Sequence, residues 1–595
     1  MVARLPKKIM KTIYQILTSG SADIAFFTEA FVTGNKEWIM KKPIIFGYHL
    51  LKINMDCRVP WRRYMISGLA PGKKCIARIY RRPKVYQYAM ALMSLSYIVT
   101  DLFGTLLEVT LDKESMYQKI EEEYQLSGFK NLRIKSENSL RTIESIYDDI
   151  SRKLGVSMNK DMELSMLKRL IVVNPYIKQV LEIAAYNHID IICILESSYS
   201  VEDIRNILCD VGIDILDIRV SNEHSKSFQE MMNDFVKSKD GVIKKEEIAV
   251  LSGNFNKVIK YGKRKHATTL YYRSAKEIMR SIPLPNLTSE FKEVYETLAG
   301  LELFSGHFNH KNLYESIYLY IAPIIYSLLD MTYQSARKSG ATVIMLCDPE
   351  SICSILYERH FGKLKPCIWT GFVGSIPATK QEWSRLIEDS CIVERFSADR
   401  LAYSLGLTFP HQPLKICKEE FIEVATKKAR RKKKEIIKEY LKYYLEKEDR
   451  ILVIDPMPGK QALSYFKEYA YEINPNIQME VVSMSQFLNK DARELSMLYQ
   501  ILQMDTPFVT GVYAKDSSEN SSSGLKELSF VQPKFMDEVK KKTIFGAMED
   551  FFTAFVAYKN MNTDFQVCSE DMNEILNYSK EGLMQLLEEL EGGAV

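Results

Sequence analysis

The sequence of 595 residues lacks features that would assign a class of protein at once. Its ten cysteines are scattered and form no CxxC pair, which favours a reduced, cytoplasmic protein over a disulfide scaffold or a zinc site. The formal net charge is only +4, so composition gives no argument for a nucleic-acid partner.

Long hydrophobic runs are also missing. Residues 89–111 and 313–331 are the most apolar stretches, but charged residues interrupt both, and a membrane-spanning helix needs about 20 apolar residues. Met1–Leu17 carries lysines among apolar residues without a continuous apolar region and cleavage site, so it predicts an amphipathic helix rather than a signal peptide. We therefore expect no transmembrane segment.

The composition is that of a globular protein, with 46% hydrophobic and 26% charged residues. Its length suggests about three to four domains. A Ser-rich stretch, residues 515–526, is the clearest flexible loop. The expected parts are a basic helical N-terminal extension at 1–90, an α/β domain at 91–285, a second α/β domain at 286–514 and a helical C-terminal tail at 527–595.

One stretch organises the first α/β domain. The apolar, β-branched run that begins at Ser96 stops at Asp101, and a Gly104-Thr105 turn follows. Ligands of an open α/β sheet bind at the carboxyl ends of its strands, so this aspartate would face the crevice. A carboxylate there can act as a covalent nucleophile while the Gly-Thr backbone holds an anion. The alternative is a buried strand whose last aspartate caps the next helix.

The segments that follow alternate between helix and strand. Residues 113–168 predict a charged helical insert, 175–187 a helix, 189–195 a strand with a Ser-rich turn, and 201–211 another helix. A short strand and loop at 215–223 and a strand at 248–254 complete the pattern. Such alternation predicts an α/β fold with a parallel sheet.

The residues Asp101-Leu-Phe103-Gly-Thr105 resemble the first motif of the haloacid dehalogenase-like (HAD) hydrolase superfamily. The resemblance implies a three-layer Rossmannoid domain in which residues 113–168 form a helical cap. It also implies that Asp101 is the nucleophile and that the Thr105 hydroxyl binds phosphate. The general acid of family phosphatases is replaced by Phe103, which cannot donate a proton to a leaving group.

The later motifs of the family can be aligned with the same domain. The second implies Ser197 or Ser198 as a phosphate-binding hydroxyl, although an ordinary helix N-cap explains these serines equally. The third implies Lys226 as the cation that neutralises nucleophile and phosphate, with Lys237 or Lys239 as competitors.

The fourth motif implies a site at Ser252-Gly253-Asn254. The following residues, Phe255-Asn256-Lys257, contain none of the acids with which the family binds magnesium. Because a hard divalent cation needs anionic oxygens, we expect no metal unless the protein is a magnesium-dependent hydrolase. Metal-independent dehalogenases of the family have an aromatic residue where Phe103 stands and a Ser-x-Asn fourth motif, but Lys257 replaces their water-activating aspartate.

A second resemblance involves residues 318–323, 343–350 and 450–461. These resemble the second half of large HAD-like proteins linked to bacterial surface polysaccharides, with Asp348 and Asp455 matching aspartates at strand ends. Gly459 and Gln461 also match, while other polar positions differ. Two buried strands that end in ordinary turns are the alternative.

Basic segments offer candidate surfaces for a partner. Arginines alternate with aromatic residues at 61–64 and 78–83, and the densest charge run is Lys427–Lys434. Each could meet an anionic partner, but a solvated face is the favoured interpretation.

Two functions from different classes therefore remain. The favoured one is a catalytically degenerate HAD-like protein that acts as a binding or scaffold component, either as a homo-oligomer or with a protein partner. The second resemblance alone implies cell-surface glycan assembly, with a glycan-pathway protein as that partner. The alternative is a HAD-type hydrolase, a phosphatase or a metal-independent dehalogenase-like enzyme. The candidate catalytic residues are Asp101, Thr105 and Lys226, and the candidate binding residues are Ser197, Ser198, Ser252 and Asn254.

Overall fold

The structure is a computed structural model. It describes residues 95–215, 217–239, 247–254, 268–272, 274–280, 285–305, 312–347, 351–366, 423, 441–442, 444–456, 460–490, 495, 498, 513–514, 528–529 and 538–579. The predictions for the extension at 1–90, the basic run Lys427–Lys434 and the loop at 515–526 lie outside the described residues, as do Lys257, Asp348 and Gly459.

β1 (Tyr97–Thr100), which precedes Asp101, lies at the centre of a five-stranded sheet of order β5-β4-β1-β6-β7. All of its strand pairs are parallel. Its other strands are β4 (Asp190–Leu195), β5 (Asp217–Val220), β6 (Ile248–Ser252) and β7 (Thr268–Tyr271). In register, Thr100 lies beside Cys193 of β4 and Leu251 of β6, so these three strands end at the same edge. The predicted α/β class with a parallel sheet is confirmed.

Both faces of this sheet are buried, as a parallel sheet requires. Successive side chains of a strand point to opposite faces. Val99, Ile192, Ile194, Ile248 and Val250 pack on one face against the apolar side of α15. The alternate residues Ile98, Cys193 and Leu251 are also fully buried. The helices connecting and following these strands are α12 (Pro175–Tyr186), α13 (Val201–Asp210), α14 (Ser221–His224), α15 (Phe228–Ser238), α17 (Ala275–Arg280) and α18 (Ser289–Phe304).

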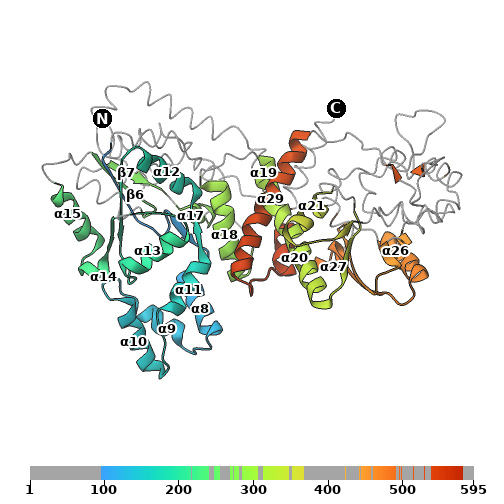
Figure 1. Ribbon diagram of the computed structural model, residues 1–595, viewed down its shortest axis with the longest axis horizontal. Coiled ribbons are helices and arrows are strands. Elements are labelled where there is room, and N and C mark those ends of the chain that lie inside the picture. Colours follow the sequence, from blue (N-terminus) through green and yellow to red (C-terminus); the bar gives the residue numbers. More distant parts are fainter. Residues whose placement is uncertain are drawn as a thin grey trace, which may run out of the picture. The chain divides into compact units, whose positions relative to one another are not determined.

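A helical insert follows β1 and is called the cap here. It consists of α8 (Lys113–Glu123), α9 (Phe129–Lys135), α10 (Ile143–Leu154) and α11 (Asp161–Leu170). The cap leaves from β2 (Leu107–Val109) and returns in β3 (Ile171–Val173), which pair as an antiparallel ribbon. Figure 1 shows the four helices grouped together at one end of this part of the chain. The insert predicted at 113–168 contains these four helices.

The described residues divide into two compact units. Unit 1 contains residues 95–305 together with 557–566, and unit 2 contains residues 312–556 together with 567–579. The boundary predicted between residues 285 and 286 falls between α17 and α18. Both helices belong to unit 1, where Arg280 of α17 forms an ion pair with Glu296 of α18.

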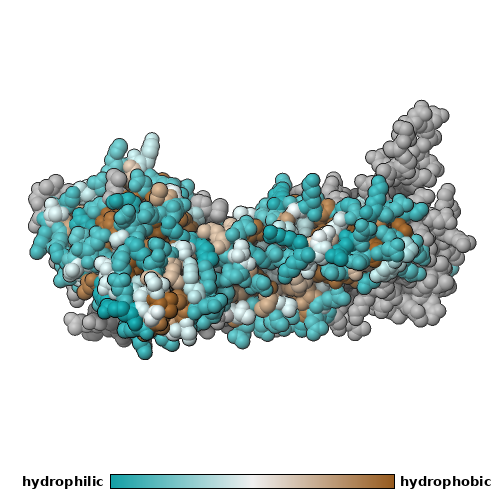
Figure 2. Space-filling view, turned by 60° about the horizontal axis from the view of Figure 1, so that its bottom comes forward, coloured by the Kyte–Doolittle hydropathy of each residue, from teal (hydrophilic) through white to brown (hydrophobic). Residues whose placement is uncertain are grey.

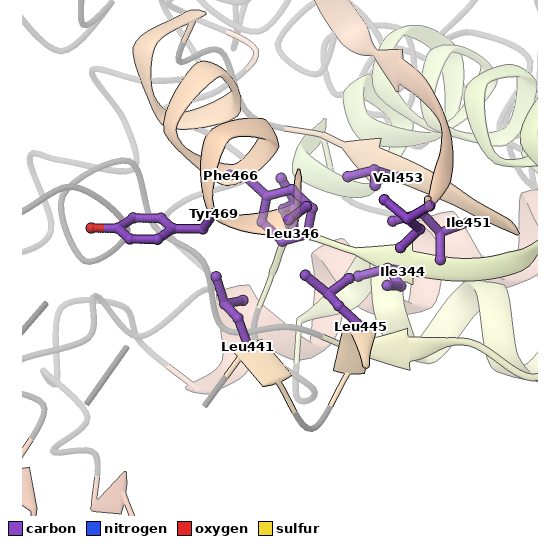
Figure 3. Close-up of a cluster of buried hydrophobic side chains, with 10 residues drawn as sticks. Ile344, Leu346, Leu441, Leu445, Ile451, Val453, Phe466 and Tyr469 are labelled. Carbon is purple, nitrogen blue, oxygen red and sulfur yellow. The ribbon is translucent and has the colours of Figure 1, made fainter. Parts of the chain in front are cut away.

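Unit 2 contains a second parallel sheet, of order β11-β10-β8-β9. Ile344, Ile451 and Val453 of this sheet pack with Leu445 and Phe466 in one buried cluster (Figure 3). Its elements are α19 (Asn312–Ser316), the π-helix η2 (Ile317–Ile321), α20 (Ala322–Ser339), β8 (Thr342–Met345), α21 (Ile352–His360), β9 (Lys365–Pro366), β10 (Arg450–Asp455), α26 (Lys460–Ile473), β11 (Gln478–Ser483), α27 (Met484–Phe487), the antiparallel pair β12 (Tyr513–Ala514) and β13 (Leu528–Ser529), and α29 (Glu538–Met561), whose last residues belong to unit 1.

In the view of Figure 2, hydrophilic residues cover most of the coloured surface and hydrophobic areas are scattered among them. The large apolar residues that are exposed include Tyr186 at the end of α12 and Leu140 in the loop before α10. Within the part of the chain that the structure describes, no helix is both long and apolar enough to cross a membrane.

Candidate functional site

The site is built on the turn that follows β1. The amide nitrogens of Leu106 and Leu107 both donate to the carbonyl oxygen of Leu102, at 3.0 and 2.9 Å, and this closes a tight loop directly after Asp101. Gly104 adopts a φ of +78°, a conformation that other residues enter only with strain. Gly104 therefore allows the chain to turn back, so that Thr105 lies near the end of β1 and contacts Asp101.

The Asp101 carboxylate is held by two hydroxyl groups. Thr105 Oγ1 donates to Asp101 Oδ1, and Ser252 Oγ donates to Asp101 Oδ2. Each hydroxyl in turn accepts a main-chain N–H: Thr105 from Gly253 at 2.6 Å, and Ser252 from Asn254 at 2.9 Å. Because those N–H groups occupy acceptor positions on the hydroxyls, the hydroxyl protons point to the carboxylate. The ends of β1 and β6 are thereby joined through Asp101.

Sequence reasoning missed two residues that support this network. Asn174 Nδ2 donates to the main-chain oxygen of Thr105 at 3.0 Å and to the Tyr272 hydroxyl at 2.6 Å. Asn174 also caps α12, since its Oδ1 accepts from the amides of Tyr176 and Ile177. Asn-Pro at the start of a helical pattern signals such a cap. No sequence signal indicates the contact with Tyr272, which lies 98 residues away.

The two serines of the turn after β4 have structural roles. Ser197 Oγ accepts from the Tyr199 amide at 3.1 Å, and the Ser197 amide donates to Ser221 Oγ at 3.0 Å. Ser198 contributes its main-chain oxygen, which accepts from the Asn222 side chain at 2.7 Å. The next serine, Ser200, caps α13. These contacts shape the turn after β4.

Lys226 pairs with an acid of the next helix. Its ammonium group pairs with the Asp234 carboxylate of α15 at 2.7 Å, and both side chains are about half exposed (48% and 47%). The hydrogen bond from Lys226 lowers the pKa of Asp234. The α14 turn and the start of α15 direct this lysine to a local partner, which a sequence alignment cannot reveal.

The electrostatic surroundings of Asp101 include one thiol. Cys193 is fully buried on β4, and burial together with the Asp101 charge raises the pKa of its thiol. The thiol is therefore neutral near pH 7, and it is a poor nucleophile or metal ligand.

Among the described residues, the groups around Asp101 offer a magnesium ion few anionic oxygens. Mg²⁺ prefers oxygen ligands in octahedral geometry and usually takes one or two carboxylates. Here one carboxylate is surrounded by hydroxyl groups that donate to it. Among the described residues, no three His, Cys, Asp or Glu side chains are grouped so that they could hold a metal.

In unit 2, two of the positions singled out from the sequence fall in the described residues. Asp455 ends β10 and is buried, with 5% of its surface exposed. Gln461 lies in α26. The neighbouring strand β8 leads to Cys347, whose sulfur accepts from Ser351 Oγ at 3.2 Å.

A comparison with protein-family models and one with curated proteins find no match for this chain.

Proposed function

We propose that this protein is a catalytically degenerate HAD-like protein that acts as a binding or scaffold component. The placement of the motif residues supports the fold assignment. Asp101 follows the central strand β1, Ser197 follows its neighbour β4, and Ser252 ends its other neighbour β6. The helical cap is inserted between β2 and β3, directly after the first motif, where the family resemblance requires it.

The position of Phe103 is the main support for a lack of phosphatase activity. It lies within the tight turn after Asp101, whose geometry is kept by Gly104 and Thr105. The proton donor of the family would occupy this position, and an aromatic ring cannot replace it. Losing general acid catalysis typically lowers a rate about 10²- to 10⁴-fold. The pairing of Lys226 with Asp234 supports the same conclusion, because the assigned cation is engaged elsewhere.

The alternative, a hydrolase with Asp101 as nucleophile, is supported by one observation. Thr105 and Ser252 hold both oxygens of the Asp101 carboxylate in place, as a nucleophile that must attack in one direction would require. Glycan assembly, with a second copy or a glycan-pathway protein as partner, is supported only by the second family resemblance.

Turnover of a panel of sugar phosphates, with and without magnesium, tests the proposal. We expect negligible hydrolysis by the full-length protein. Hydrolysis at ordinary phosphatase rates that Asp101→Asn abolishes would favour the alternative. Light scattering of the full chain at low and high salt tests the scaffold part for a homo-oligomer, and a monomer without a stable partner contradicts it.

A further inference from the structure

The cap contacts the sheet domain through residues that follow the carboxyl ends of β4 and β5. The Ile143 amide at the start of α10 donates to the Ser198 oxygen at 2.9 Å. Ser221 Oγ donates to the Ser139 oxygen at 2.5 Å. Since Ser198 and Ser221 follow these strand ends, the cap is held against the same sheet edge as Asp101.

A buried ion pair lies inside the cap beside these contacts. Arg133 of α9 donates to both oxygens of Glu163 of α11, at 2.7 and 2.8 Å. Their side chains are 3% and 0% exposed. The guanidinium group also lies over the Tyr117 ring, 4.9 Å from its centroid. A carboxylate at such depth must keep its donors, because removing one leaves a buried charge poorly satisfied.

Two tyrosines complete the hydrogen bonding of Glu163, and they come from different parts of unit 1. Tyr147 of α10, within the cap, donates to Glu163 Oε2 at 3.1 Å. Tyr199, in the turn after β4, donates to Glu163 Oε1 at 2.7 Å. Tyr199 directly follows Ser198 in the chain, so the buried carboxylate of the cap binds the same turn that receives the Ile143 amide.

The segment that joins β2 to the cap is held by α17. Lys276 Nζ of α17 donates to the oxygens of Val109 and Thr110, at 2.8 and 2.9 Å. Arg280 of the same helix pairs with Asp112, the residue that precedes α8, at 2.7 Å. The connection through which the cap leaves the sheet is thus fixed by α17. On its other side the cap contacts the turn after β4 and, through the ion pairs Lys160–Asp203 and Lys168–Asp210, the helix α13.

We propose that Tyr199 and Glu163 form a latch that holds the cap closed on the turn after β4. Opening the cap breaks the hydrogen bond between them and leaves the buried Glu163 carboxylate with one donor fewer. The latch therefore fastens the cap to the sheet edge at which Asp101 lies. The inference goes beyond the proposed function and holds whether or not Asp101 is catalytic.

Hydrogen–deuterium exchange of the full-length protein, measured by mass spectrometry, tests the latch. Tyr199→Phe removes the donor from the sheet domain while keeping the ring. Tyr147→Phe is the matched control, since it removes a phenol donor from the same carboxylate without crossing to the sheet domain. The reporting peptides cover residues 139–143 and 196–200, which contain the contact between Ile143 and Ser198.

We expect Tyr199→Phe to speed exchange in both peptides by about tenfold or more, as loss of a hydrogen bond to a charged group implies. Tyr147→Phe should speed exchange clearly less, because the hydrogen bond from Tyr199 to the cap remains. Unchanged exchange in Tyr199→Phe would overturn the latch. Equal acceleration by both variants would also overturn it, because the effect would then come from general loosening of the cap.

Discussion

Gly253 packs against the main chain of Gly104, so that a Cβ atom on Gly253 would lie 2.4 Å from the Gly104 carbonyl oxygen. Real Cβ atoms essentially never approach a backbone atom within 3.0 Å. This contact sets the separation between the end of β6 and the turn after β1, and thereby the position of Ser252 and Thr105 on either side of Asp101.

Gly253→Ala should therefore destabilise the protein. The methyl group must displace the turn after β1, which weakens the hydrogen bond from the Gly253 amide to Thr105. Insertion of a methyl group into packed structure costs about 1–3 kcal/mol. Gly546→Ala in α29 is the control, because a Cβ there meets nothing within 4 Å and alanine favours a helix. A melting temperature unchanged by Gly253→Ala would contradict the close contact.

The Thr105 hydroxyl should matter more than the Thr105 methyl group. Thr105→Val keeps the shape of the side chain but leaves the Gly253 amide without its acceptor and removes a donor to Asp101. We expect a loss of about 1–3 kcal/mol in the free energy of unfolding, measured by urea denaturation. Thr105→Ser keeps the hydroxyl and should lose clearly less. Equal losses in the two variants would show that the hydroxyl network contributes little.

The bridge between Lys160 of the cap and Asp203 of α13 should make stability depend on pH. Their charged groups lie 2.8 Å apart. Partial burial disfavours the charged form of both groups, but hydrogen bonds outweigh it. Hydrogen bonds to Asp203 and Glu144 raise the pKa of Lys160 to about 12. Hydrogen bonds from Lys160 and Ser200 lower the pKa of Asp203.

Because the pKa of Asp203 is lower in the folded state, this group stabilises the protein at pH values above about 3.9, the pKa of an unfolded aspartate. The stabilisation is lost as the pH falls through the pKa of Asp203 in the folded state. The raised pKa of Lys160 contributes stability below the unfolded value of about 10.4, and this is lost as pH rises toward 12. Lys160→Met should thus reduce the free energy of unfolding by a constant amount between about pH 5 and 9, and by less under more acidic conditions. Lys153→Met, on an exposed position of α10, is the control and should show no such dependence.

Magnesium at millimolar concentration should not stabilise the protein. The Asp101 site offers one carboxylate among hydroxyl donors, and a ligand raises the melting temperature only if it binds the folded state. Thermal shift with magnesium, and with calcium for comparison, measures this. A rise with magnesium that disappears in Asp101→Asn would show that the site binds the metal.

Carboxylates introduced at the two altered motif positions should restore phosphatase activity if the HAD-like interpretation is right. Phe103→Asp supplies the missing acid, and Asn254→Asp adds an anionic oxygen beside Ser252, whose hydroxyl accepts from residue 254. We expect magnesium-dependent hydrolysis of sugar phosphates to appear in the double variant and to vanish when Asp101→Asn is added. A stable double variant that stays inactive with every phosphate ester would count against the assignment.

The local elements around the site can be predicted from the sequence. The strand expected at 189–195 is β4, the helix at 201–211 is α13, and the helix at 175–187 is α12. Apolar periodicity and capping residues act over a few neighbours, so they can be read along the chain. The same holds for the turn at Gly104 and Thr105, whose conformation depends on glycine at one position.

Which side chains meet depends on the tertiary structure. Asp101 and Ser252 are 151 residues apart, and their contact depends on the parallel register of β1 with β6. Lys226, which motif order places near the nucleophile, instead reaches Asp234, eight residues further along the chain. The burial of Glu163 with Tyr199 likewise depends on how the cap folds back onto the turn after β4. Strand order, register and side-chain reach fix such pairs, and none of these leaves a periodic signal in the sequence.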